Sequence, residues 1–460
     1  MVWSQILSVS RLVSNKAERM IRMNQDRNKE WDVIVVGAGI AGLTASIYMA
    51  REGLSVLLLD KGGKAGGRAD STEMANARVN LGPHALYKSA LPILREVGVS
   101  LTGASPKPNG TFVFKGTNGQ NKALPFAQLF LGSFLKWNEK MQLFRFYSRL
   151  RKTDSSALRS VSLQAYLDSQ IASPRVQSLV LALVRVSTYC HAPRLLSAGA
   201  AIEQLQHGQV LYVDGGWQSI VSQLTEQALQ AGVSIRASSP AAEIAGAWPQ
   251  MTVSLKDGTQ LAARSVLSTA GPTETLSLLH PALPSADAAR YEQLIPVRAA
   301  CLDLVVKGMP DPKTRFALGA DFPWYYSNHS AVASFSDDPE LSVVHAMKYL
   351  PVGMESDPQQ DKRELEGFLD LIQPGWRSHV VQQRFLPRLL VSHAAVTAES
   401  GGFKGRPGTA VEGRPGLYAA GDWAGDSGML ANASLTSAKD AAHCIIARIQ
   451  KGKEGIHRGA

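Results

Sequence analysis

The sequence predicts an α/β fold in which a parallel-sheet domain is interleaved with an α+β domain. Three stretches lead to this prediction: residues 31–60, a second glycine-rich loop at residues 61–68, and an apolar strand that ends in Gly421-Asp422. The first and last of them lie at opposite ends of the chain. A length of 460 residues also exceeds what one simple core organises, so two domains are expected.

Residues 31–60 have the pattern of a strand, a tight turn, a helix and a second strand. Gly37 permits the sharp turn, Gly39 leaves room for a pyrophosphate, and Gly42 lets the helix pack close to the strand. The helix N-terminus offers N–H groups to phosphates, and Asp60 is placed to accept hydrogen bonds from ribose hydroxyls. This context indicates a Rossmann-type dinucleotide site. Its predicted residues are Gly37, Gly39, Ile40, Ala41, Gly42 and Asp60.

Charge and cysteine content exclude several classes of protein. The net charge of +10 is concentrated in three segments, with seven basic residues and one acidic residue between 122 and 152, so we expect no nucleic-acid partner. Three widely spaced cysteines exclude a disulfide framework and favour a reducing, cytoplasmic location. No apolar run reaches the roughly 18 residues of a spanning helix. Residues 1–30 are expected to form a basic, disordered extension, and Met23 could also serve as the start.

The second loop, at residues 61–68, carries three cations among glycines and could wrap backbone N–H groups and Arg68 around a phosphate or flavin edge. With the fingerprint and the acid before it, this loop resembles the superfamily of flavin amine oxidases, protoporphyrinogen oxidases and phytoene desaturases. The resemblance implies FAD. Residues 80–87 resemble the segment that lies under the flavin in the phytoene-desaturase-like branch. The cofactor residues implied here are Lys61, Gly66, Gly67, Arg68, Gly82, Pro83 and His84.

Later segments resemble the remaining parts of this cofactor domain. The backbone at Ala241 would meet the adenine, and a strand ending at Ala270 and Gly271 leads out of the domain. In the closing motif Asp422 would contact the ribityl or pyrophosphate region. Amides at the start of the last helix would face the flavin's pyrimidine edge, where the helix dipole stabilises a reduced, negatively charged flavin. The residues implied in this motif are Gly421, Asp422, Met429 and Leu430.

The rest of the chain is assigned to a substrate-binding domain. The FAD-binding domain takes residues 31–105, 205–272 and 415–450, and the substrate-binding domain takes 106–204 and 273–414. A hairpin is expected around Phe112-Val113-Phe114 and a strand over 341–350. The candidate catalytic or cavity-lining residues are His84, Trp324, Tyr325 and His345.

Residues 130–152 have an unusual distribution of apolar side chains. One helical stripe contains Phe130, Phe134, Trp137, Met141 and Phe144, and another on roughly the opposite side contains Leu135, Leu143, Phe146 and Leu150. Cations lie between the stripes. One stripe can face the domain core, and the other could face a lipid surface or an apolar substrate entrance. The alternative is a helix sandwiched in the domain interior, with basic side chains reaching solvent. The cations are Lys136, Lys140, Arg145 and Arg149.

The predicted chemistry is oxidation of a small organic substrate by bound, non-covalent FAD. The amine-oxidase branch has a lysine that should fall in the strand 297–306, where this chain has Leu302 or a neighbour, and an aromatic residue where it has Met429. These departures favour a dehydrogenase or desaturase acting on a largely apolar substrate. A flavin amine oxidase, a redox-neutral isomerase holding reduced FAD and a catalytically silent flavin-binding protein remain alternatives. No metal site and no second dinucleotide fingerprint are expected, and the electron acceptor stays open.

Overall fold

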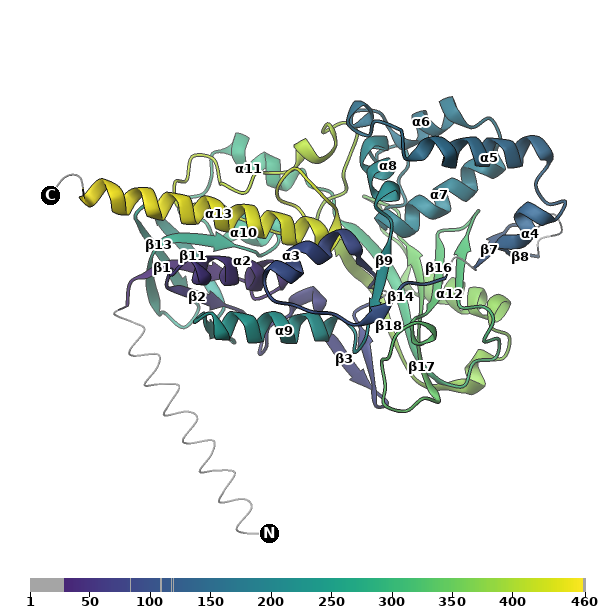
Figure 1. Cartoon of the computed structure of the whole chain (residues 1–460), viewed down its shortest axis with the longest axis horizontal. Coiled ribbons are helices and arrows are strands. Elements are labelled where there is room, and N and C mark those ends of the chain that lie inside the picture. Colours follow the sequence, from purple (N-terminus) through teal and green to yellow (C-terminus); the bar gives the residue numbers. More distant parts are fainter. Residues whose placement is uncertain (1–28, 83, 108–109, 117, 119, 458–460) are drawn as a thin grey trace, which may run out of the picture.

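The computed structural model describes residues 29–457 with the exception of Pro83, residues 108–109, residue 117 and residue 119. The predicted extension at residues 1–30 and the cofactor prediction at Pro83 therefore fall outside the described residues, apart from residues 29 and 30. Two seven-stranded sheets dominate the structure, together with a two-stranded and a three-stranded sheet. Figure 1 shows the two large sheets next to one another, with the long C-terminal helix α13 running along the first of them.

The first sheet contains the parallel strands predicted from residues 31–60. Its order is β10-β2-β1-β13, and β13 also pairs in parallel with β19. The hairpin arms β11 and β12 extend it on the other side of β13 in antiparallel fashion. The strands are β1 (Trp31–Val36), β2 (Val56–Leu59), β10 (Ser234–Arg236), β11 (Ala241–Ala247), β12 (Gln250–Leu255), β13 (Gln260–Ser268) and β19 (Leu417–Ala419).

Apolar side chains on both faces of this sheet are covered by helices, as the β-branched sequence of β1 requires. Val33 and Val35 pack toward α2, α9 and α13, whereas Ile34 and Val36 pack toward the opposite face. On that second face lie side chains of α10 and α11, such as Leu276. The helices around the sheet are α2 (Ile40–Arg51), α3 (Leu91–Glu96), α9 (Trp217–Gln230), α10 (Pro272–Leu278), α11 (Ser285–Glu292) and α13 (Leu430–His457).

The packing of α10 and α11 corrects one predicted boundary. We expected residues 273–414 to belong wholly to the substrate-binding domain. Leu279, Leu283 and Tyr291 instead join the core of the first sheet, and the Tyr291 ring lies 5.4 Å from that of Trp423. After β13 the chain returns to the second sheet only at Val297, the first residue of β14. Because a helix pair can cover either sheet, sequence composition did not reveal that α10 and α11 pack on the first one.

The second sheet has the order β18-β14-β17-β16-β15-β7-β8 and is antiparallel except between β15 and β7. One face packs against α12, and the other packs against helices α5 to α8 and the hairpin β3-β4. Its strands are β7 (Thr111–Phe114), β8 (Lys122–Pro125), β14 (Val297–Lys307), β15 (Phe316–Gly319), β16 (Trp324–Asn328), β17 (Leu341–Tyr349) and β18 (Val380–Ser392). The predicted hairpin at residues 112–114 and the strand at 341–350 are confirmed.

The remaining elements connect the two sheets or cover the second one. The hairpin β3-β4 and the strands β5, β6 and β9 form the two small sheets. Among the described residues, no helix combines the length and the apolar character needed to cross a bilayer. The elements are β3 (Ser71–Met74), β4 (Ala77–Asn80), β5 (Leu86–Tyr87), β6 (Gly103–Ala104), β9 (Val210–Val213), α4 (Phe126–Leu131), α5 (Trp137–Leu150), α6 (Leu163–Gln170), α7 (Pro174–Thr188), α8 (Ala198–Gln206) and α12 (Pro358–Ile372).

The prediction of continuous helical stripes over residues 130–152 is wrong in one respect. Two helices, α4 and α5, cover this region, and the chain is extended at Gly132 between them. Phe134 lies in the connection, where its ring packs 4.5 Å from that of Phe114. Within α5 the stripes do separate as expected, because Leu143 is buried while Phe144 is exposed. An interior helix with both stripes covered is therefore excluded.

Candidate functional site

The turn between β1 and α2 has the geometry that its glycines predict. Gly37 has a φ of +106°, and a Cβ there would lie 2.6 Å from Thr269 Oγ1. A Cβ on Gly42 would collide with the carbonyl oxygen of Gly37. Gly39 is different, because its φ of −73° suits any residue and a Cβ would find nothing closer than Gly66 O at 4.0 Å. The space in front of Gly39 is thus open.

This open space lies at the N-terminus of α2. The helix begins at Ile40, its second residue Ala41 is buried, and no side chain caps it at Gly39. Uncapped N–H groups and the positive end of the helix dipole form a site for phosphate oxygens. The position next to Gly39 therefore fits a pyrophosphate, which a side chain at residue 39 would displace.

Asp60 ties the two glycine-rich loops together. Its Oδ2 accepts a hydrogen bond from the Ala38 N–H at 2.6 Å, and its Oδ1 accepts one from the Gly62 N–H at 2.6 Å. Its backbone oxygen accepts from the Ser239 N–H at 2.8 Å, which brings the start of β11 at Ala241 near the end of β2. The carboxylate oxygens keep further lone pairs, so a ribose contact stays a prediction. Lys61 beside it is exposed.

The second loop folds back onto the turn. The Gly66 N–H donates to Ala38 O at 2.9 Å, and Gly66 forms a bridge with Gly39. Gly67 has a φ of +56°, and a Cβ there would lie 3.6 Å from the Gly39 Cα. Both glycines hold positive φ values that other residues rarely adopt. The loop therefore forms a second wall beside the phosphate position.

Arg68 and Asp422 form a bidentate ion pair across 354 residues of sequence. Arg68 Nη1 and Nη2 each lie 2.9 Å from an oxygen of Asp422. His393 adds its backbone N–H at 3.2 Å and its Nδ1 at 3.0 Å. Burial alone would raise the pKa of Asp422, but the charge of Arg68 and the hydrogen bonds from His393 and Arg68 hold it well below its ordinary value.

These four hydrogen bonds occupy both oxygens of Asp422, which is 2% exposed. The carboxylate thus holds Arg68 in place next to the turn. The sequence predicted a contact between Asp422 and a ribityl or pyrophosphate group, and that prediction did not include this positioning role. No sequence motif indicated His393 as a site residue. It follows directly after β18, and only the crossing of the chain brings it to the closing motif.

The closing motif places its residues around the start of α13. Met429 is buried in an apolar cluster with Ala200, Val396 and Phe403. Leu430 begins the helix with a φ of +56°, an unusual value for a leucine that is often found where a backbone meets a ligand. Hydrogen bonds with Ser437 anchor Gly421. Position 429, where the resemblance leads us to expect an aromatic residue in the amine-oxidase branch, thus carries a buried apolar side chain.

The residues that follow strand β13 contact both the β1-α2 turn and the closing motif. Thr269 Oγ1 donates to the carbonyl oxygen of Gly37 at 2.8 Å, and Ala270 O accepts from Trp423 Nε1 at 3.1 Å. Gly271 is the N-cap of α10, and a Cβ there would lie 2.6 Å from His393 Nε2. The residues predicted at the end of β13 therefore lie between the turn and the Asp422 cluster.

The segment after β4 connects the first sheet with the second. A Cβ on Gly82 would lie 3.9 Å from Cys301 Sγ and would collide with Leu389. His84 lies edge-on to Trp217 with ring centroids 5.0 Å apart, and its Nδ1 is buried with no partner among the described residues. Burial lowers the pKa of His84 to about 4, and the nearby charges of His345 and Arg68 act in the same direction.

Beside this segment, a row of polar side chains crosses the second sheet. Arg384, Asp303, His345 and Ser327 occupy opposed positions on the neighbouring strands β18, β14, β17 and β16. Asp303 accepts hydrogen bonds from His345 Nδ1 at 2.7 Å and from Arg384 Nε at 2.9 Å, and its side chain has no exposed surface. The row thus carries a buried acid, a base and a guanidinium.

A hydrogen bond connects this row to residues 80–87, the segment implied to lie under the flavin. Arg384 Nη2 donates to Asn80 O at 2.5 Å, and Cys301 Sγ donates to Asp303 Oδ1 at 3.0 Å. Donor atoms of Cys301, Asp303 and His345 lie within 4.8 Å of one another, as a metal site would require. Because Arg384 already supplies the cation for Asp303, we interpret this cluster as a hydrogen-bonded network.

Of the candidate catalytic residues, His345 lies in this row, whereas Trp324 does not. Trp324 lies on the opposite face of the sheet, where its ring stacks on Phe322 and Phe368 at centroid distances of 4.1 and 5.3 Å. Tyr325 is the next residue and faces the site, with its hydroxyl 3.2 Å from that of Tyr212. Neighbouring residues of a strand point to opposite faces, so the two could not line one cavity.

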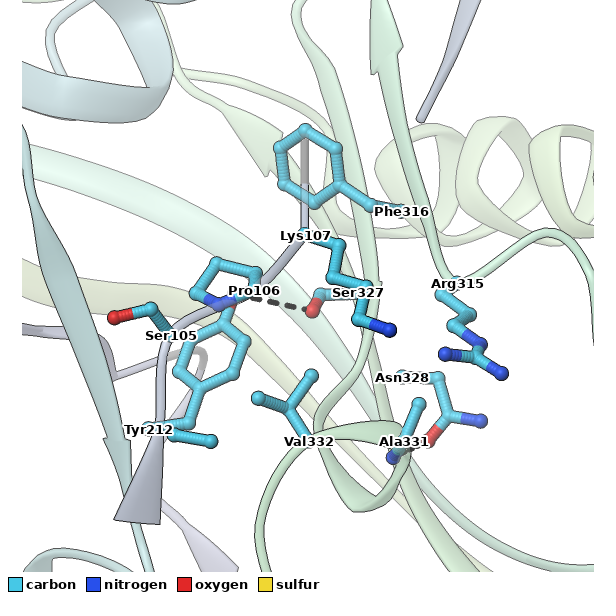
Figure 2. A pocket seen from close by; sticks show the side chains of 11 residues that line it. Ser105, Pro106, Lys107, Tyr212, Arg315, Phe316, Ser327, Asn328, Ala331 and Val332 are labelled. Atoms are coloured by element: carbon cyan, nitrogen blue, oxygen red, sulfur yellow. Dashed lines mark hydrogen bonds between the residues drawn. The ribbon is translucent and has the colours of Figure 1, made fainter. Parts of the chain in front are cut away.

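The polar row continues to a surface pocket of about 150 Å³. Tyr212 OH lies 3.2 Å from Ser327 Oγ at the pocket wall, and Figure 2 shows this hydrogen bond with Lys107 and Arg315 nearby. Behind it, the His329 ring stacks on Tyr212 at 4.3 Å and lies 4.4 Å from that of His345. Sequence reasoning did not select His329, Tyr212 and Ser327, because Tyr212 and Ser327 reach the site through strand register and His329 through the turn after β16.

A family model, sequence relatives and solved structures agree with the arrangement described above. The family model "Flavin containing amine oxidoreductase" matches residues 40–302. A pseudooxynicotine dehydrogenase from Pseudomonas sp is 29% identical over 132 residues, which are 28% of this chain and 26% of that protein. A carotenoid 3,4-desaturase from Haloarcula japonica is 48% identical over 52 residues, 11% of this chain and 10% of that protein.

These sequence matches span 26% and 10% of the two relatives, whereas a structural match extends over nearly the whole molecule. A putrescine oxidase structure superimposes with a TM-score of 0.73 at 15% identity, covering 91% of this chain and 99% of that one. At that identity the match concerns the fold alone. The family model covers more than half of the chain, and the open cradle at Gly39 fits the flavin that its members contain. The chain belongs to the flavin-containing amine oxidoreductase family.

Proposed function

We propose that this protein is an FAD-dependent dehydrogenase or desaturase of the phytoene-desaturase-like branch, which oxidises a largely apolar organic substrate by hydride transfer to the flavin. The observation that carries the proposal is the face of β14 turned toward Gly82. This face presents Cys301 and Asp303, and the strand contains no lysine before Lys307 at its end. Leu302, at the expected lysine position, faces the α12 side.

FAD is favoured over a mononucleotide flavin because the β1-α2 turn and the loop at residues 61–68 both flank the phosphate position. The open cradle at Gly39 suits a pyrophosphate, and Asp60 lies at the end of β2 where a ribose is expected. Arg68, held by Asp422, adds a positive charge beside the turn. A mononucleotide would use only part of this arrangement.

The surroundings of Cys301 favour an apolar substrate. Leu386, Leu389 and Leu430 are partly exposed side chains that pack on the same cluster as Cys301 and Met347. Asp303, the acid nearest to Gly82 on this strand, is neutralised by Arg384 and is thereby poorly suited to hold an ammonium group.

When bound, the flavin supplies the hydride acceptor. The protein must then receive the proton that a neighbouring carbon loses when a double bond forms. Nδ1 of His345 donates to Asp303, so Nε2 is the nitrogen that can accept a proton, and it has no partner among the described residues. The Asp303 carboxylate would stabilise the resulting imidazolium, and the buried surroundings would exclude water.

The test is anaerobic bleaching of the bound flavin by two matched panels of compounds, apolar alkenes or partly saturated polyenes and primary or secondary amines. We expect bleaching by a member of the first panel, together with one new double bond per flavin reduced. Bleaching by amines alone would overturn the proposal in favour of an amine oxidase. Movement of a double bond without bleaching would instead identify an isomerase.

A flavin that no compound reduces, although dithionite does, would support the silent flavin-binding alternative. Variants at the proposed base sharpen the experiment. His345→Gln should slow bleaching by the productive substrate by about 10²–10⁴-fold, the usual contribution of a general base. Arg145→Gln, which changes an exposed side chain on α5, serves as the control and should leave the rate unchanged.

A further inference from the structure

Helices α4 and α5 carry an exposed apolar patch at one end of the molecule. We define the α4–α5 patch as Phe130, Leu131, Trp137, Phe144 and Tyr147, whose exposed fractions are 53%, 88%, 77%, 65% and 37%. They are five of the nine large hydrophobic side chains exposed in the described part of the chain, and they fall within 18 residues. Figure 1 places α4 and the start of α5 at the end furthest from the C-terminus. Such clustering marks an interaction surface.

The patch is held on a rigid support. On the opposite side of α5, Leu143, Phe146 and Leu150 are buried in the core shared with α7 and α8. Glu139 in the first turn of α5 accepts a hydrogen bond from Ser173 at 2.7 Å, and Lys140 Nζ donates to Gly132 O at 2.8 Å. The second bond joins α5 to the end of α4. The apolar side chains are thus held outward without a covering element in the described structure.

The solvent-facing charges of the stretch that carries the patch, residues 126–152, are all of one sign. Between residues 126 and 152 the only acid is Glu139, which is 8% exposed and lies 3.6 Å from Arg175. The exposed charged side chains of the same stretch are Lys136, Arg145, Arg149, Arg151 and Lys152. A surface with aromatic residues between cations is complementary to a layer of anionic head groups above acyl chains.

We propose that the α4–α5 patch docks the protein on an anionic lipid surface, with α5 lying along the membrane plane. Trp137 and Phe144, two turns apart on α5, would enter the boundary between head groups and acyl chains. The cations beside them would contact phosphate and carboxylate groups. This proposal stands on the surface alone, so it holds whichever substrate the flavin site oxidises.

Co-sedimentation of the flavin-loaded protein with vesicles tests the proposal. We expect binding to vesicles of phosphatidylcholine with phosphatidylserine, weak binding to phosphatidylcholine alone, and release by salt. The triple variant Lys136→Gln/Arg145→Gln/Arg149→Gln should lower the partition coefficient by about a hundredfold, since each cation near an anionic surface contributes about fivefold. Lys140 is left intact because it joins α5 to Gly132.

A second variant, Trp137→Ser/Phe144→Ser, should weaken binding to the same vesicles even at low salt. Its matched control is Leu229→Ser, which removes an apolar side chain with 57% exposure from α9. Equal flavin content and circular dichroism would show that each variant folds. The proposal is overturned if the wild type stays in the supernatant at low salt, or if both patch variants sediment like the control. The proposal is also overturned if the wild type does not bind lipid but forms a concentration-dependent dimer that the patch variants lose. That result would assign the patch to contact with a second copy of the chain.

Discussion

Asp303 and His345 face one another across the neighbouring strands β14 and β17, with Asp303 Oδ1 2.7 Å from His345 Nδ1 and neither side chain exposed. On the other side of β14, Arg384 of β18 binds the second oxygen. Burial alone would raise the pKa of Asp303, but His345 and Arg384 hold it below its ordinary value. The acid is therefore an anion that depends on both partners.

Removing Arg384 should destabilise the fold strongly. In Arg384→Met the Asp303 carboxylate stays buried with His345 as its remaining strong partner, so we expect the free energy of unfolding to fall by about 3–5 kcal/mol. The control is Arg388→Met on the same strand, where the pair with Glu355 is exposed and is worth about 1 kcal/mol or less. Urea unfolding measures both. Equal losses in the two variants would contradict a buried ion pair at Asp303.

Gly39→Val should abolish flavin loading without unfolding the domain. The φ of −73° permits valine, and the side chain would fill only the open space next to the N-terminus of α2. Flavin absorbance per protein, read beside the circular dichroism spectrum, gives the result. Gly63→Val is the matched control in the neighbouring loop, because a Cβ there meets nothing within 4 Å. A Gly39→Val protein that purifies with full flavin would refute the assignment of the phosphate position.

Asp60→Ala should weaken flavin binding less than Gly39→Val does. The substitution releases the N–H groups of Ala38 and Gly62 and removes the predicted ribose acceptor, which together cost about 1–3 kcal/mol. Titration of apoprotein with FAD would show this as a higher Kd with an unchanged number of sites. Asp70→Ala, which breaks only the partly exposed pair with Lys64, is the comparison. An unchanged Kd in Asp60→Ala would remove Asp60 from the site.

Stability should fall as the pH is lowered from about 6.5 to about 4. Burial lowers the pKa of His84 and His191 to about 4, so in this window the unfolded chain binds more protons than the native one. Each histidine can then cost about 3 kcal/mol at pH 4. Urea unfolding with excess FAD should show a shallower pH dependence for His191→Gln than for the wild type. Parallel curves would mean that His191 does not cause the loss.

The sequence by itself determined the parts of the molecule whose geometry is local. The β1-turn-α2 unit is local because the positive φ of Gly37 and the close approach of Gly42 to the Gly37 carbonyl arise within a few residues of chain, and Asp60 follows at the end of the next strand. The two stripes of α5 also follow from helical periodicity. Which of these stripes is covered, however, depends on α7 and α8.

Only the tertiary structure decided how distant segments share the site. Arg68 meets Asp422 across 354 residues, and the row of Arg384, Asp303, His345 and Ser327 exists because four strands pair in one register. A shift of one residue would turn each of these side chains to the opposite face, as the contrast between Trp324 and Tyr325 shows. Register depends on the packing of whole sheets, which is why local sequence patterns could not reveal this part of the site.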